Sequence, residues 1–165
     1  MHTSMQGMTL VEIMIVIALI GVGMTVATPS FNAMIARNQA ATQINELVTS
    51  INLARSEASK ISGTVSIQAT TPGVNFDFMD GWCVVVGNPG NCTGTTAEPV
   101  IRHSPPILGA TSLRSESATL QFNAYRALNS EVANRTFSFC GPVKSRLITV
   151  SLVGRVSLSD GVVCP

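Results

Sequence analysis

The N-terminal part of the chain is dominated by one long apolar run. From Met8 to Ala27 the only polar side chains are those of Thr9, Glu12 and Thr25. Twenty helical residues rise about 30 Å, which is close to the thickness of a bilayer core. We therefore expect a single membrane-spanning helix. A cleaved secretory signal is less favoured, because the residues before the run include no Lys or Arg and no small-residue cleavage site follows it.

The helical pattern continues beyond this run. After Pro29, apolar residues recur at spacings of three and four, at Ile44, Leu47, Val48, Ile51, Ala54, Ala58 and Ile61. Gly63 then ends the pattern as a C′ glycine would. We expect one helix from about Thr9 to Ser62, with a second half whose single apolar stripe needs a partner sheet. We also expect Pro29 to bend the helix, with a locally unwound stretch between Gly21 and Pro29.

The remainder of the chain, residues 64–165, has the pattern of β-structure. Short alternating or apolar runs are separated by clusters of Gly, Pro and Asn: TVSIQAT, GWCVVVG, PVIRHS, ATLQFN, RTFSFC and RLITVSL. A tight hairpin is expected at Val153-Gly154, between RLITVSL and GRVSL. Asn88–Glu98 and Ser104–Ser117 have the composition of irregular segments. The predicted fold class is therefore α+β, a long N-terminal helix packed on antiparallel β-sheets.

The four cysteines all lie in this β-rich part. In an exported domain an even number of cysteines indicates disulfides, and four allow three pairings. Cys83 and Cys92 flank a short loop, whereas Cys140 lies at a strand end and Cys164 is next to last. We favour Cys83–Cys92 and Cys140–Cys164, with free buried thiols as the alternative.

The stretch QGMTLVEIMIVIALIG, followed by a proline at Pro29, resembles the N-terminus of the type IV pilin-like superfamily. The resemblance implies that a prepilin peptidase cuts after Gly7 and that Met8 becomes the N-methylated first residue. Glu12 then matches the glutamate at the fifth position of the mature chain in the family motif. Two departures are present: Met8 replaces the usual phenylalanine, and the leader lacks its usual basic residue.

The resemblance also implies the organisation of the chain. Residues 1–7 form a leader, 8–28 a transmembrane and assembly helix, 29–63 its amphipathic continuation, and 64–165 a periplasmic β-rich domain. The protein is then held in the inner membrane by a single span. Glu12 is implied to pair with the α-ammonium of a neighbouring subunit, an attraction strengthened in a low-dielectric filament core. The alternative is an unpaired glutamate at the membrane interface.

Three later stretches narrow the resemblance to one branch of the superfamily. INLARSEASKISGTVSI, FSFCG and ITVSLVGRVSLSDG resemble the H-type minor pseudopilins and the FimT/FimU-type minor pilins. At FNAYRALN the chain departs from the glycine that the family tends to have. The implied function is co-assembly with other minor and major pilins or pseudopilins, at the initiating tip of a type IV pilus or a type II secretion pseudopilus.

Catalytic chemistry has little support in the sequence. Outside the leader, His103 is the sole histidine, so a histidine-rich metal site is excluded, and no G-x-S-x-G context accompanies the serines. Asp77 and Asp80 lack the spacing of a calcium loop and are interpreted as a solvated turn. We expect no catalytic residues, no metal and no cofactor. A membrane-anchored periplasmic enzyme stays the weakest alternative.

The C-terminal residues are basic. Residues 133–165 contain Arg135, Lys144, Arg146 and Arg155 against Asp160 alone. Such a cluster can bind phosphates, and some FimT-type pilins bind DNA during transformation through a G-R-x-R motif. Here the motif has its first arginine, Arg155, but Ser157 in place of the second. DNA uptake is therefore an alternative function, and a solvated basic face is the favoured interpretation.

Overall fold

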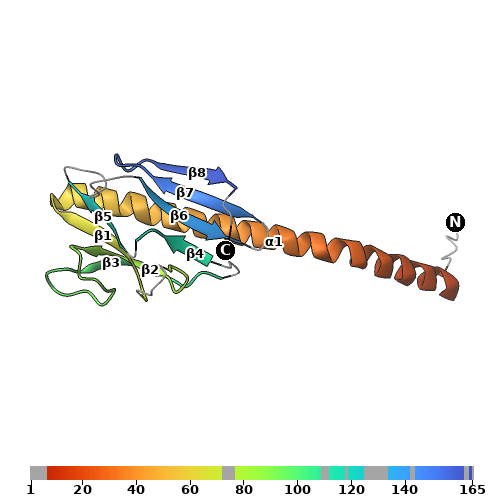
Figure 1. Ribbon diagram of the computed structural model, residues 1–165. Helices are drawn as coiled ribbons and strands as arrows, with labels where there is room; N and C mark the ends of the chain where they lie inside the picture. Colours follow the sequence, from red (N-terminus) through yellow and green to blue (C-terminus); the bar gives the residue numbers. More distant parts are fainter. Residues whose placement is uncertain are drawn as a thin grey trace, which may run out of the picture. The chain divides into compact units, whose positions relative to one another are not determined.

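The computed structural model describes residues 7–71, 77–108, 112–117, 119–124, 134–141, 144–161 and 164, without the side chains of residues 25–29. The chain forms two compact units, Met1–Ile35 and Ala36–Pro165. The first contains the beginning of helix α1 (Leu10–Ile61), and the second contains the rest of this helix and all of the strands (Figure 1).

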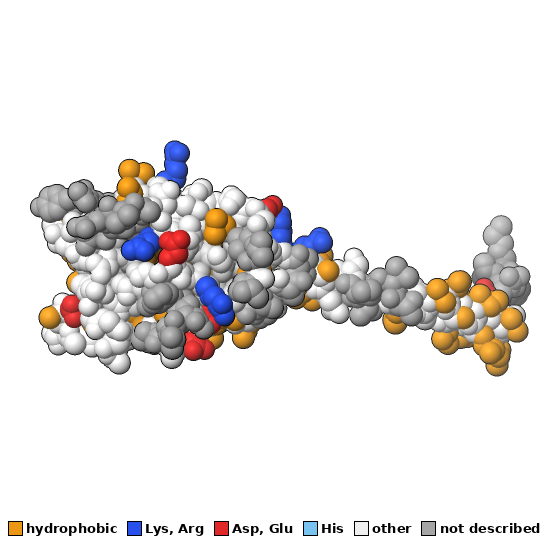
Figure 2. Space-filling model, in the orientation of Figure 1, with side chains coloured by type: hydrophobic (Ala, Val, Ile, Leu, Met, Phe, Trp, Pro, Cys, Tyr) orange, Lys and Arg blue, Asp and Glu red, His pale blue; other side chains and the backbone are white. Residues whose placement is uncertain are grey.

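In the first unit, α1 exposes large apolar side chains on all sides. Leu10, Val11, Met14, Ile17 and Leu19 are among those more than half exposed, and they form the hydrophobic surface seen on this part of the helix in Figure 2. Among the described residues, no helix contains a stretch that is both long and apolar enough to be assigned as a membrane span.

Helix α1 is more continuous than expected. Its backbone is helical throughout Leu10–Ile61, so the unwound stretch predicted between Gly21 and Pro29 was wrong. The hydrogen-bonding cost of one proline and two glycines is small compared with the ladder of a 52-residue helix. The expected bend at Pro29 stays a prediction, because this side chain lies outside the described ones.

The second unit contains two four-stranded antiparallel sheets. The first has the order β3-β2-β1-β5 and the second the order β4-β6-β7-β8. The strand bounds are β1 Thr64–Ala69, β2 Trp82–Val86, β3 Val100–Ser104, β4 Ser112–Ser115, β5 Thr119–Asn123, β6 Arg135–Cys140, β7 Ser145–Val150 and β8 Val156–Asp160. The predicted α+β class, a long helix on antiparallel sheets, is confirmed.

One strand lies where the sequence predicted an irregular segment. Strand β4 pairs with β6, placing Leu113 opposite Phe139. It has only four residues, and Leu113 is its one buried side chain. An alternation this short is not visible as a pattern, so pairing with β6 rather than local sequence defines this strand.

The apolar stripe of α1 enters the core between the helix and the sheets. Ile44, Leu47, Ile51, Ala54 and Ala58 are buried in one cluster with side chains of both sheets, as the helical periodicity predicted. The buried stripe ends at Ala58, three residues earlier than predicted, because Ile61 is 43% exposed at the end of the helix. Phe78 meets Phe137 of β6 edge to face, with ring centroids 5.3 Å apart, and this contact extends the core toward the second sheet.

Polar contacts also fix the helix to the first sheet. The Trp82 indole N–H donates to the hydroxyl of Ser50 (2.9 Å), and this hydroxyl donates to the carbonyl of Glu46 (3.0 Å). The Glu46 carboxylate accepts from Arg102 at 2.8 Å and from the Ser104 hydroxyl at 3.1 Å, both on β3. These bonds set the rotation of α1 about its own axis against β2 and β3.

Both disulfides are present. Cys83 is bonded to Cys92 and Cys140 to Cys164, the two pairs favoured from the sequence. The first closes the loop after β2, and the second ties residue 164 to the end of β6. Chain-entropy arguments assign about 2.6 kcal/mol to the shorter loop and about 3.4 kcal/mol to the longer one.

Candidate functional site

The proposed cleavage bond lies in an accessible backbone segment. Residues 7–9 have no regular secondary structure, and α1 begins directly afterwards at Leu10. Gly7 and Met8 are exposed, and nothing lies within 4 Å of where a Gly7 Cβ would be. A peptidase needs an extended, accessible backbone on both sides of the bond that it cuts. Among the described residues, Gly7, Met8 and Thr9 are exposed and outside any helix or strand, so the Gly7–Met8 bond is accessible.

Glu12 lies in the first turn of α1 and has a local role that the sequence analysis missed. The Thr9 hydroxyl accepts a hydrogen bond from the Glu12 backbone N–H at 3.3 Å. Thr9 is therefore the N-cap residue, and Glu12 lies at N3 in the T-x-x-E sequence order of a capping box. The negative side chain also lies at the positive end of the helix dipole. The signal was present in the sequence as TLVE, directly before the apolar run.

The four candidate DNA-binding cations do not form one cluster. Arg135 of β6 is paired with Val150 of β7, and Val150 is paired with Val156 of β8. Arg155 directly precedes Val156. Arg146 lies four residues back along β7, about 13 Å away at about 3.3 Å per strand residue, and faces Asp160. The sheet therefore places Arg135 and Arg155 toward one end and Lys144 and Arg146 toward the other.

Arg155 lies outside the strands, in the connection between β7 and β8. The Ser151 N–H donates to the Arg155 carbonyl (2.9 Å), and the Gly154 N–H donates to the Ser151 carbonyl (2.7 Å). Gly154 has a φ of 76°, which favours glycine. The tight hairpin predicted at Val153-Gly154 is confirmed. Arg155 is exposed, and Ser157 follows on β8.

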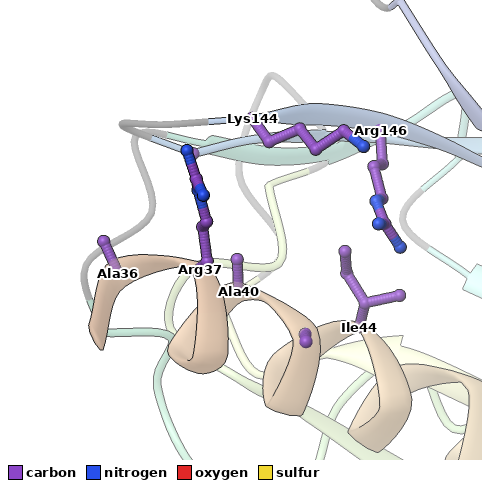
Figure 3. A pocket seen from close by; sticks show the side chains of 8 residues that line it. Ala36, Arg37, Ala40, Ile44, Lys144 and Arg146 are labelled. Atoms are coloured by element: carbon purple, nitrogen blue, oxygen red, sulfur yellow. The ribbon is translucent and has the colours of Figure 1, made fainter. Parts of the chain in front are cut away.

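Lys144 and Arg146 line a pocket together with Arg37 of α1 (Figure 3). Its volume is about 480 Å³, and Ala40, Ala41 and Ile44 form its helical wall. Asp160 pairs with Lys144 at 2.8 Å and with Arg146 at 3.5 Å. The hydrogen bond from Lys144, followed by the charges of Lys144 and Arg146, holds the pKa of the Asp160 carboxyl below its usual value.

The residues considered for other chemistry are scattered. His103 is exposed on β3. Asp77 accepts a hydrogen bond from the Met79 N–H at 3.0 Å, as in a local turn. Its backbone forms an isolated antiparallel β-bridge with that of Arg114. Over the described part of the chain, no three metal-ligating side chains gather in one place.

The fold and the N-terminal arrangement are those of a type IV pilin-like protein. A family model described as "Type II transport protein GspH" matches residues 43–154, and a model of the "Prokaryotic N-terminal methylation motif" matches residues 3–28. The first match covers about two thirds of the chain, so the protein belongs to the GspH family. No curated protein matches.

Solved structures agree with this assignment. The chain is similar to the type IV minor pilin FimU of Pseudomonas aeruginosa strain PAO1 in two crystal forms. One has a TM-score of 0.59 and 26% identity, with 74% of this chain and 90% of that chain covered. The other has a TM-score of 0.54 and 25% identity, with 74% and 91% covered. The chain is thus a minor pilin or pseudopilin, and its family and fold are those of structural pilins.

Proposed function

We propose that this protein is cut after Gly7, N-methylated at Met8, and assembled through α1 with other minor and major pilins or pseudopilins. Residues 1–7 are the leader, 8–28 the membrane and assembly helix, 29–63 its amphipathic continuation, and 64–165 the periplasmic domain. In this proposal the chain is held in the inner membrane as a single-pass protein before it joins the initiating tip of a type IV pilus or a type II secretion pseudopilus.

The observation that carries the proposal is the exposed Gly7–Met8 bond directly before a capped helix. That helix exposes apolar side chains on all sides over the first unit. Such a surface needs either lipid or other apolar helices around it. In this proposal lipid covers the apolar surface before assembly, and the α1 helices of neighbouring subunits cover it after assembly.

We propose a second role for Glu12 beside capping: its carboxylate pairs with the α-ammonium that cleavage creates on a neighbouring subunit. The two roles are separable by substitution. Gln is as suitable as Glu at the N3 position of a capped helix but has no charge. Val has neither the charge nor a polar side chain, and it retains the backbone N–H that donates to the Thr9 hydroxyl.

The experiment places Glu12→Gln, Glu12→Val and the unchanged chain in a strain without the native copy. We expect all three to reach the membrane fraction. Both variants should reduce filament or secretion output more than about tenfold, the effect of losing about 1.4 kcal/mol of subunit attraction. Normal output from Glu12→Gln together with low output from Glu12→Val would contradict the charge pairing and indicate that a polar side chain at position 12 is sufficient.

The DNA-uptake alternative receives no specific support from the arrangement. Its four cations are divided between two ends of the second sheet. Phosphate binding strengthens with the number of contacts made together, so two separated pairs favour weak and salt-sensitive attraction.

A further inference from the structure

We propose that the pocket between α1 and the start of β7 binds the phosphate of an anionic phospholipid headgroup. This inference rests on the proposed function, because it requires the chain to reside in the membrane. It assigns to Arg37, Lys144 and Arg146 a ligand that neither filament assembly nor DNA binding demands.

The charge of the pocket favours an anionic ligand. Arg37 comes from α1, whereas Lys144 and Arg146 come from the segment that begins β7, and all three line one pocket (Figure 3). Asp160 is the acidic side chain paired with Lys144 and Arg146. Three cations and one shared carboxylate leave a net charge of +2, which suits a phosphate diester. Among the described residues, Arg37 has no ion pair of its own, so its guanidinium is available to a ligand.

The size and the mixed polarity of the pocket favour a lipid headgroup. A volume of about 480 Å³ lies within the range of about 300–1,000 Å³ that is common for small-ligand sites. Ala40, Ala41 and Ile44 supply an apolar wall beside the cations. A lipid presents the same combination, a phosphate next to a glycerol backbone and acyl chains. A bare inorganic anion has no use for the apolar wall.

The pocket also follows the exposed apolar part of α1 directly in the sequence. Large apolar side chains are exposed from Met8 up to Ile35, and the pocket begins with the next residues of the same helix, Ala36 and Arg37. Long basic side chains near the end of a membrane helix extend to the lipid headgroups at the membrane surface. Arg37 has the place in sequence that such a contact requires.

The test uses the full chain, purified in a neutral detergent and titrated with phosphatidylglycerol, with bound lipid counted by native mass spectrometry. We expect Arg37→Gln and Arg146→Gln each to weaken binding about tenfold, since each removes a charge-assisted hydrogen bond. Arg55→Gln is the matched control, because Arg55 is an exposed arginine of the same helix that does not line the pocket. Equal binding by all of these chains would overturn the proposal.

Asp160→Asn provides a change in the opposite direction. It removes the carboxylate that competes with the ligand for Lys144 and Arg146, so binding should tighten about two- to fivefold, the scale of an exposed ion pair. Unchanged or weaker binding would count against these cations as the phosphate ligands.

Two further probes identify the source of the phosphate. Glycerol 3-phosphate has the headgroup chemistry without acyl chains, and we expect it to bind at least about tenfold more weakly than the lipid. Equal affinity would overturn the lipid assignment in favour of a small-anion site. Duplex DNA that competes through Arg37 more strongly than phosphatidylglycerol would overturn it in favour of nucleic acid. Cleavage after Gly7 is measured separately, so normal cleavage without lipid binding rejects this inference and leaves the proposed function intact.

Discussion

A single buried hydroxyl connects the helix to the sheet. Ser50 is fully buried, and it accepts from the Trp82 indole while donating to the Glu46 carbonyl. Trp82 is 1% exposed, so its N–H has no access to water if the serine oxygen is lost. A buried donor without a partner costs more than an average hydrogen bond contributes. Glu46 then carries the connection to Arg102 and Ser104 on β3.

Ser50→Ala should lower the free energy of unfolding by about 1–3 kcal/mol, because the Trp82 N–H is left unpaired. Trp82 is the one tryptophan of the chain, so urea unfolding of the full chain in detergent can be followed by its fluorescence. Ser59→Ala is the control: Ser59 also donates to the carbonyl four residues back, at 3.1 Å, but on the exposed face. Equal effects of the two substitutions would contradict the importance of the buried bond.

Helix α1 ends in a way that the sequence did not indicate. The Gly63 N–H donates to the Ala58 carbonyl at 3.2 Å, the six-to-one bond of a Schellman motif. The residue in the left-handed conformation is therefore Ser62, with a φ of 52°, and not Gly63 as predicted. Gly63 instead occupies the following position. A residue with a Cβ pays about 1–2 kcal/mol for this conformation.

Ser62→Gly should therefore stabilise the protein by up to about 1 kcal/mol, after the greater flexibility of glycine in the unfolded chain is subtracted. The corresponding rise in Tm is about 2–4 °C for a chain of this size. Ser56→Gly, in the exposed interior of the same helix, should act in the opposite direction by a similar amount. A loss of stability in Ser62→Gly would contradict the described helix end.

Patterns carried by neighbouring residues were predictable from the sequence. The stripe from Ile44 to Ala58 and the strands of the sheets follow from local periodicity. Two features could not be predicted in this way. Strand β4 is defined by its pairing with β6, and the left-handed conformation of Ser62 is defined by the geometry of one turn. The pocket was not predictable either. Its cations come from positions 37, 144 and 146, and only the packing of α1 near β7 brings them together.

The two units of the molecule have different surfaces and different partners. The first exposes apolar side chains and contains the capped start of α1, whereas the second has a closed core and two disulfides. Stability of the second unit comes from its own packing and crosslinks. On the proposed function, lipid or other subunits cover the first unit, whose helix has no apolar partner of its own among the described residues. This division is what a filament subunit stored in a membrane requires.

The central claim is that the chain is cut between Gly7 and Met8, and an intact-mass measurement tests this cleavage most directly. The full chain is coexpressed with a prepilin peptidase, extracted from membranes and analysed by mass spectrometry. We expect a mature chain that begins at Met8 and carries one added methyl group on its α-amine. We also expect Gly7→Val to abolish the cut while leaving the chain in the membrane. A mature chain that begins elsewhere, for instance after Ala27, or a Gly7→Val chain that is still cut at Met8, would contradict the claim.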